Sequence, residues 1–249
     1  MLEKASSNNI LRKARLLMDE AGVSPMSDDV GDGSIFTEDT INLETYLKGV
    51  LTDAIRAVFL VAPLYKIAAS SLRGEKSIFD LQEFNGFSFT VSDSGHGVIT
   101  LPNNFLRFSS MKLKSWKRPV TEIQEQGSLL WLQQYVPETE AGFWKPVCNW
   151  VDLKEHGRCI ELHPLRLVNL SSLTLTPDEL KAFLADKVEH FTYIPTPYVN
   201  FDANFIKPNM DASLADAAAY MSASLVCEIY EKPNESKAFG DRAIKIAMS

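Results

Sequence analysis

The chain has 249 residues, of which 45% are apolar and 23% are charged, an ordinary balance for a globular protein. A chain of this length buries a substantial core without metals or disulfides, which disfavours disordered, collagen-like and coiled-coil classes. The formal net charge of −7 disfavours general nucleic-acid binding, because phosphate contacts need clustered Lys and Arg.

The sequence predicts no membrane segment and no secretory signal. Residues 1–7 contain no apolar core of a signal peptide, and the most apolar short run covers only residues 57–63. A membrane-spanning helix needs roughly 20 apolar residues. The chain has three cysteines, a small and odd number that does not fit a secreted disulfide framework, so we expect synthesis in a reducing cytoplasm.

Two amphipathic helices are predicted near the N-terminus. Over residues 10–21, apolar side chains recur at helical spacing, and Gly22 is a plausible stop. Residues 42–62 repeat the pattern, and Pro63 ends that helix because proline disfavours helical geometry in the residue before it. The last turn of the second helix is apolar on all sides, which predicts burial by its own fold or by a neighbouring subunit.

The middle of the chain has the alternation of strands. Residues 87–91 and 98–101 predict a hairpin, because a turn-rich stretch separates them. A short helix is expected over 127–135, and Thr176 opens a capping box that predicts another helix. Further strands are predicted at 108–116, 147–153, 159–162 and 188–194.

The last part of the chain begins with a proline-rich stretch. Residues 195–212 contain Pro195, Pro197 and Pro208, which predicts an extended arm that orders on partner subunits rather than on itself. Ser213 is the predicted N-cap of a long helix, with Asp216 at N3.

The expected fold is α+β: one domain, 1–249, in which a bundle of N- and C-terminal helices carries an inserted β-rich subdomain and an extended proline-containing arm. The expected parts are a helical hairpin at 10–62, the subdomain at 85–194, the arm at 195–212 and C-terminal helices at 213–249.

Metal ligands are present in two weak patterns. Cys148, His156, Cys159 and His163 suit zinc, but their spacing lacks a CxxC pair, so buried thiols in strands are the favoured interpretation. A calcium loop over 28–39 has Asp28, Asp32, Gly33 and Asp39 in place, yet Val30 occupies a ligand position. We predict no bound metal and no cofactor.

No pattern of a common enzyme class occurs, and we predict no catalytic residues. His96, between two glycines, is interpreted as a turn residue, and His190 as a residue on the surface of a strand. The basic residues Lys112, Lys114, Lys117 and Arg118 are interpreted as the solvent face of a strand rather than a DNA contact.

Three segments resemble the head-to-tail adaptors of tailed bacteriophages, most closely the ring proteins of crAss-like phages. Residues 11–22 (LRKARLLMDEAG) resemble the first helix of these adaptors. Residues 101–108 (LPNNFLRF) resemble their Leu-Pro-x-x-Phe-x-Arg segment, and 114–123 (KSWKRPVTEI) its continuation. Lys145-Pro146-Val147 also recurs in such proteins.

The resemblance implies a structural virion protein, made in the bacterial cytoplasm, that forms a twelve-subunit ring below the portal protein. Its partners would be further copies of itself, the portal and the next neck or tail ring protein, with DNA only passing through an acidic channel. The candidate interface anchors, each equally compatible with an ordinary core position, are Phe59, Trp116, Trp131, Trp144 and Tyr198.

Three alternatives stay open. The chain is compatible with a lower neck or tail-hub ring protein of the same virion, which binding to the portal would distinguish. An enzyme with an unrecognised site predicts a deep polar pocket with perturbed titratable groups. A metal-binding domain built on residues 148–163 predicts bound metal.

Overall fold

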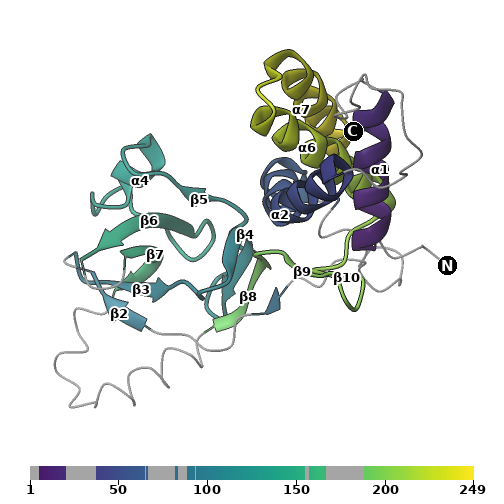
Figure 1. The fold of residues 1–249 in the computed structure, drawn as a ribbon. Helices are drawn as coiled ribbons and strands as arrows, with labels where there is room; N and C mark the ends of the chain where they lie inside the picture. The colour runs from purple at the N-terminus through teal and green to yellow at the C-terminus, as the bar shows by residue number, and fades with distance from the viewer. Residues whose placement is uncertain are drawn as a thin grey trace, which may run out of the picture. The chain divides into compact units, whose positions relative to one another are not determined.

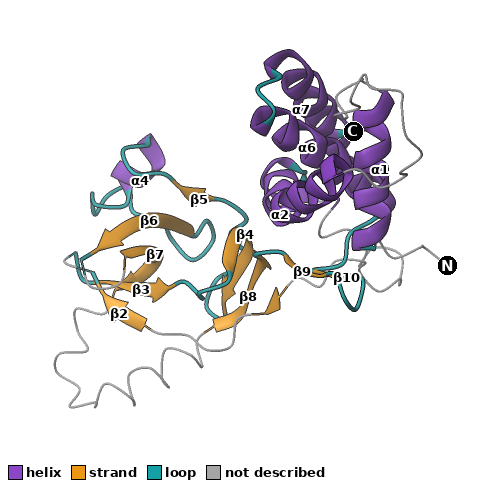
Figure 2. Cartoon of the chain, in the orientation of Figure 1, coloured by secondary structure: helices purple, strands orange, loops and turns teal. Residues whose placement is uncertain are grey.

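The computed structural model describes residues 6–20, 38–64, 66, 82–83, 89–92, 94–154, 157–166 and 188–249. Three predicted features lie outside these residues: most of the calcium loop, His156 and the helix predicted to begin at Thr176. The described part is a mixture of helices and antiparallel sheets, which confirms the α+β class (Figure 2). The chain divides into two compact units, residues 1–81 with 196–249 and residues 82–195.

Four helices belong to the first unit within the described residues, and we call this unit the helical unit. They are α1 (Ser7–Glu20), α2 (Glu38–Val61), α6 (Ala212–Ile229) and α7 (Pro233–Met248). In Figure 1 the purple and blue helices from the start of the chain lie beside the yellow-green helices from its end. Helix α6 contacts all three of the others, so it is the centre of this unit.

The apolar stripes predicted from the sequence form the core of the helical unit. The stripe of α2 is fully buried, with Leu43, Leu47, Leu51, Ile55 and Val58 at 1% exposure or less. Helix α6 buries small side chains instead, mainly Ala and Ser, which lets neighbouring helices approach closely. A Cβ atom added at Gly240 of α7 would lie 3.1 Å from the Ser224 hydroxyl of α6, so the two helices are closely packed there.

Helix α6 begins two residues earlier than predicted. The N-cap is Asp211, whose Oδ1 accepts a hydrogen bond from the Leu214 backbone N–H at 2.8 Å. Ser213, the predicted cap, lies inside the helix and donates its hydroxyl to Asp211. Both Asp and Ser cap helices well, and in this structure the Asp211 carboxylate accepts from a backbone N–H of the first helical turn.

The proline-rich stretch is not a fully extended arm, because its middle folds back on itself. Strand β9 (Tyr198–Asn200) pairs antiparallel with β10 (Phe205–Lys207). Asn200 Oδ1 accepts from the Ala203 N–H at 2.8 Å, and Asn204 adopts a positive φ of 50°, which asparagine tolerates better than most residues. The expectation that this stretch has no partner within its own chain was therefore wrong.

The hairpin also contacts the start of α1 within the helical unit. Asn204 Oδ1 accepts hydrogen bonds from the Asn8 backbone N–H at 2.9 Å and from the Ser7 hydroxyl at 3.1 Å. The first N–H groups of a helix lack intrahelical partners, so Asn204 satisfies one of them from a distant part of the chain.

The described residues of the second unit, which we call the β-rich unit, form two sheets and one short helix. A five-stranded sheet has the order β2-β3-β7-β6-β5, and a three-stranded sheet has the order β1-β8-β4. Among the strand pairs that the structure describes, only β5–β6 is parallel. The elements are β1 (Gln82–Glu83), β2 (Phe89–Val91), β3 (His96–Thr100), β4 (Phe105–Leu113), β5 (Ile123–Gln124), α4 (Leu129–Gln133), β6 (Val147–Leu153), β7 (Gly157–Arg166) and β8 (Val188–Pro195).

Residues of both sheets form one apolar core in this unit. It includes Ile160 and Leu162 of β7, Met111 of β4 and Phe191 of β8, together with the fully buried ring of Trp116. The other face of β7 is not apolar, and the candidate site lies there. Within the described ranges, no helix combines the length and the apolarity needed to cross a membrane.

Candidate functional site

The five candidate interface aromatics fall into two groups. Phe59 and Trp116 are buried in the cores of their units, which is the core alternative that the sequence left open. Trp131 is half-buried, and its indole N–H donates to the Trp150 carbonyl at 3.3 Å. Trp144 and Tyr198 are exposed, at 72% and 57%, so of the five these two are the most accessible to a partner.

Trp144 belongs to a run of exposed apolar residues that the sequence analysis did not single out. Helix α4 is apolar in four of its five positions, yet none of its residues is buried. Such a helix normally packs against something, because exposed apolar area is unfavourable in water. We call residues 129–144 the apolar segment; its exposed large side chains are Leu129, Leu130, Leu132, Tyr135, Val136, Phe143 and Trp144.

A buried polar cluster lies on the face of β7 opposite the apolar core. Alternation along the strand puts Glu161 and His163 on one face and Ile160 and Leu162 on the other. His96, at the start of β3, contributes its ring to the same cluster, and the ring centroids of His96 and His163 are 4.2 Å apart. All three polar side chains are almost completely shielded from solvent.

Glu161 is the acceptor at the centre of this cluster. Its Oε1 accepts from the hydroxyls of Ser92 at 2.5 Å and Ser94 at 2.7 Å. Its Oε2 accepts from the Tyr135 hydroxyl at 2.6 Å and lies 3.1 Å from His163 Nε2. A buried carboxylate needs such donors, because without them burial favours the protonated form.

The two effects on Glu161 oppose each other. Burial alone would raise the pKa of its carboxyl, but the hydrogen bonds from the surrounding imidazole and hydroxyl groups outweigh burial and hold this pKa well below its ordinary range. Conversely, burial and the hydrogen bond to Glu161 raise the pKa of Tyr135. The cluster therefore contains a stable carboxylate faced by a neutral phenol donor.

A second carboxylate, Glu140, faces the histidines from the apolar segment. Its Oε1 lies 3.1 Å from His96 Nε2 and 3.8 Å from His163 Nδ1. Gln134 shapes the loop before Glu140, because its buried amide donates to the Leu130 carbonyl and accepts from the Ala141 N–H. His163 Nδ1 has no hydrogen-bond partner among the described residues, although the ring is 0% exposed.

This arrangement contains possible metal ligands. His96, Glu161 and His163 each offer a ligand atom, and within the described residues these atoms lie within 4.8 Å of one another. Neutral imidazole and carboxylate groups are the donors that zinc and related divalent ions take.

The metal-ligand set considered from sequence is not brought together. Cys148 pairs with Leu162 across the β6–β7 ladder, so its side chain lies on the core face, opposite His163. Burial in that core raises the pKa of its thiol, which disfavours the thiolate that binds metal. Cys159 shares the face of His163 but is four residues away, about 13 Å along an extended strand.

The basic stretch has the predicted orientation. Met111, Leu113 and Trp116 are buried, whereas Lys114, Lys117 and Arg118 are exposed. Lys112 pairs with Glu189 of the neighbouring strand β8 at 2.7 Å. Part of this basic charge is therefore compensated within the sheet.

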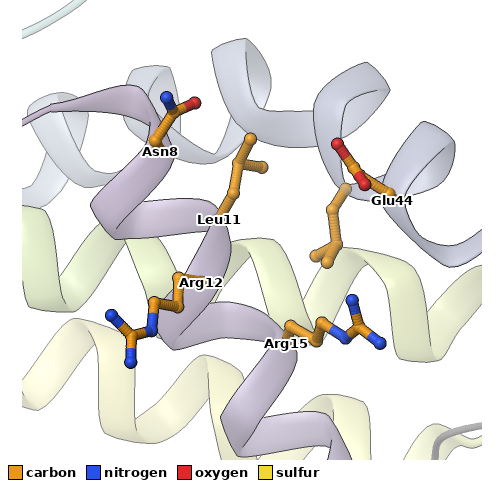
Figure 3. A pocket seen from close by; sticks show the side chains of 6 residues that line it. Asn8, Leu11, Arg12, Arg15 and Glu44 are labelled. Carbon is orange, nitrogen blue, oxygen red and sulfur yellow. The ribbon is translucent and has the colours of Figure 1, made fainter. Parts of the chain in front are cut away.

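A shallow groove of about 380 Å³ lies between α1 and α2 of the helical unit (Figure 3). Its lining combines Leu11 and Leu47 with the charged side chains of Arg12, Arg15 and Glu44. Arg15 also lies 3.9 Å from Asp19, and Glu44 pairs with Lys48 at 2.6 Å. Arg15 and Glu44 thus have ordinary partners on their own helices, and the groove contains no evident catalytic set among the described residues.

Sequence reasoning missed His96, Tyr135, Glu140 and Glu161 because they come from separate parts of the chain. The usable signal was small: Glu161-Leu162-His163 alternates within a predicted strand, so its two polar side chains share a face. That face would have been expected to contact water, and only the tertiary structure shows that residues 134–141 cover it.

Comparisons with known proteins add no relative. No protein-family model matches the chain, and neither a curated protein nor a solved structure is significantly similar to it.

Proposed function

We propose that this chain is a structural subunit of a ring that joins the head of a tailed bacteriophage to its tail. In this proposal the terminal helices form a bundle that docks below the portal, and the β-rich unit is an insertion that extends the ring. The order of the three sequence segments that resemble phage adaptors supports the proposal, as does the division of the chain into a helical and a β-rich unit.

The observation that carries the proposal is the apolar segment, residues 129–144. A helix that is apolar on nearly all sides and buries no residue is incomplete as part of an isolated chain. Ring subunits of one kind make head-to-tail contacts, in which one surface of each copy meets a different surface of the next. We assign the apolar segment to the contact with the neighbouring copy, with Leu129 and Trp144 as its anchors because both are 72% exposed.

The net charge fits a channel protein better than a DNA-binding protein. With a formal charge of −7, the subunits repel duplex DNA on average, so DNA would pass without being held.

The test is the mass of the purified protein, alone and mixed with the cognate portal protein. We expect a stoichiometric ring on the portal. We expect Leu129→Lys combined with Trp144→Lys to fold normally, since both side chains are exposed, but to reduce ring assembly at least tenfold. Asn103→Lys, which adds a charge at an exposed turn of the same unit, is the matched control.

Two outcomes would count against the proposal. Undiminished assembly of the double variant would remove the apolar segment from the interface. A wild-type protein that forms a ring but ignores the portal would instead belong lower in the neck or in the tail hub.

A further inference from the structure

The cluster formed by His96, Glu140, Glu161 and His163 has a feature that the ring proposal does not use. Each imidazole has one carboxylate at each of its two nitrogens. Glu161 faces His96 Nδ1 at 3.6 Å and His163 Nε2 at 3.1 Å. Glu140 Oε1 faces the remaining nitrogens, His96 Nε2 and His163 Nδ1. The two rings are therefore held between an inner carboxylate and an outer one.

The contacts of the imidazoles with Glu161 and Ser94 indicate which ring nitrogens carry a proton. Ser94 donates its hydroxyl proton to Glu161, so its oxygen is left to accept from His96 Nδ1, 3.0 Å away. His163 Nε2 lies 3.1 Å from Glu161 Oε2 and donates to it. In the neutral imidazoles, the lone pairs then lie on His96 Nε2 and His163 Nδ1, and both of these atoms face the same oxygen of Glu140.

A carboxylate oxygen facing two imidazole lone pairs is an unfavourable arrangement unless something positive lies between them. A proton on His96 Nε2 satisfies one contact of Glu140, at 3.1 Å, but the buried His163 Nδ1 still has no hydrogen-bond partner among the residues that the structure describes. A divalent cation would satisfy all three atoms at once. The spacings from Glu140 Oε1, 3.1 and 3.8 Å, bracket the edge of about 3.4 Å expected for a tetrahedron with zinc–ligand bonds near 2.0–2.1 Å.

We propose that this cluster is a zinc-type metal site, with His96 Nε2, His163 Nδ1 and Glu140 as ligands and with Glu161 orienting His163 directly and His96 through Ser94. A carboxylate that accepts from the second nitrogen of a ligating histidine is the usual support of such sites. Water fills the fourth position, because Glu140 is the partly solvent-exposed member of the set. The ion joins residues 134–141 to strands β3 and β7.

This role explains why the apolar segment is held in place although its helix buries nothing. Glu140 follows α4 by seven residues, and Tyr135 of the same stretch donates its hydroxyl to Glu161 in the same cluster. An ion at Glu140 adds a strong bond at the end of a segment that otherwise depends on a few hydrogen bonds. The metal site stands independently of the ring proposal, because it needs no partner subunit.

The test uses the full chain, purified without a histidine tag, stripped with a chelator and titrated with zinc chloride by calorimetry. We expect one zinc ion per chain and a higher melting temperature for the β-rich unit. Glu140→Gln should weaken zinc binding at least tenfold, whereas Glu138→Gln, the same charge change at an exposed site of the same loop, should leave it unchanged. Glu161→Gln should weaken it by about 10–100-fold through the histidines.

Cobalt(II) provides a second readout that does not depend on stability. We expect the visible absorption of tetrahedral cobalt in the wild type and in Glu138→Gln, and its loss in Glu140→Gln and in His96→Gln. Tryptophan fluorescence would establish that the β-rich unit of these variants is folded, because all four tryptophans belong to that unit. No zinc binding by the folded wild type, or equal binding by the Glu138 and Glu140 variants, would overturn the proposal.

Discussion

The two units of this chain stabilise their interiors in different ways. In the helical unit the described buried residues are apolar or small and neutral, and Ser is the only buried polar type. The β-rich unit buries a carboxylate and two imidazoles behind a sheet whose opposite face packs on the apolar core. The first kind of core tolerates imperfect packing at a graded cost, whereas the second requires every member of a polar network to be present.

The chain contains a natural means of observing the units separately. Its four tryptophans, Trp116, Trp131, Trp144 and Trp150, all belong to the β-rich unit, whereas helical circular dichroism comes mainly from the helical unit. Tryptophan fluorescence and circular dichroism at 222 nm therefore report on different parts of the molecule, and each substitution below is followed with both.

The largest effect is expected from Glu161→Ala in the β-rich unit. Removing the acceptor leaves two buried imidazoles without their carboxylate and takes the acceptor from two hydroxyls and a phenol, so we expect a loss of about 3–5 kcal/mol in the free energy of unfolding. The fluorescence transition in urea, with a chelator present, should shift more than the circular dichroism transition. A loss below about 1 kcal/mol would mean that water reaches the cluster.

A somewhat smaller effect is expected from Leu51→Ala in the helical unit. Leu51 is fully buried in the stripe of α2, and truncation there removes buried methyl groups and leaves a cavity, for about 3 kcal/mol. Here the circular dichroism transition should shift more than the fluorescence transition. Equal shifts of both signals would show that the two units unfold together, so that the difference between their cores does not give them separate stabilities.

The smallest effect is expected at the start of α6, and it distinguishes two candidate caps. Asp211→Ala should cost about 1 kcal/mol, because the Leu214 N–H loses its acceptor. Ser213→Ala should cost less, since the Ser213 hydroxyl only donates to Asp211. The comparison is made by thermal unfolding at 222 nm, and the opposite ranking would restore Ser213 as the cap.

Sequence patterns predict the structure correctly where one local pattern determines it. Ile10, Ala14 and Met18 recur at helical spacing, and all three are buried in α1. The strand predicted at 147–153 coincides with β6 (Val147–Leu153), because alternation and flanking turns leave little choice. The hairpin at 89–100 was predicted for the same reason.

The errors have a common physical cause, which is that distant residues determined the outcome. Three prolines in 195–212 indicated an extended chain, but Asn200 stabilises a hairpin by accepting from the Ala203 N–H. Asn204 of the same hairpin accepts from the Asn8 N–H at the start of α1. His96 next to two glycines suggested a turn, and nothing local predicts that Glu140 and Glu161 meet it 44 and 65 residues later. A local sequence pattern that spans a few residues does not predict contacts between residues so far apart in the chain.

The helical unit has one more consequence, for the order of events during synthesis. Helices α1 and α2 emerge from the ribosome first, but their apolar stripes pack on α6, and Lys13 of α1 pairs with Asp216 of α6. The β-rich unit is contiguous in the sequence, and its residues are translated after α1 and α2 and before α6 and α7. Nascent chains can thus complete the β-rich unit early, while the bundle closes only after residue 229 has been translated. Translation itself then acts as a checkpoint, because a prematurely terminated chain lacks the helices that its first two need.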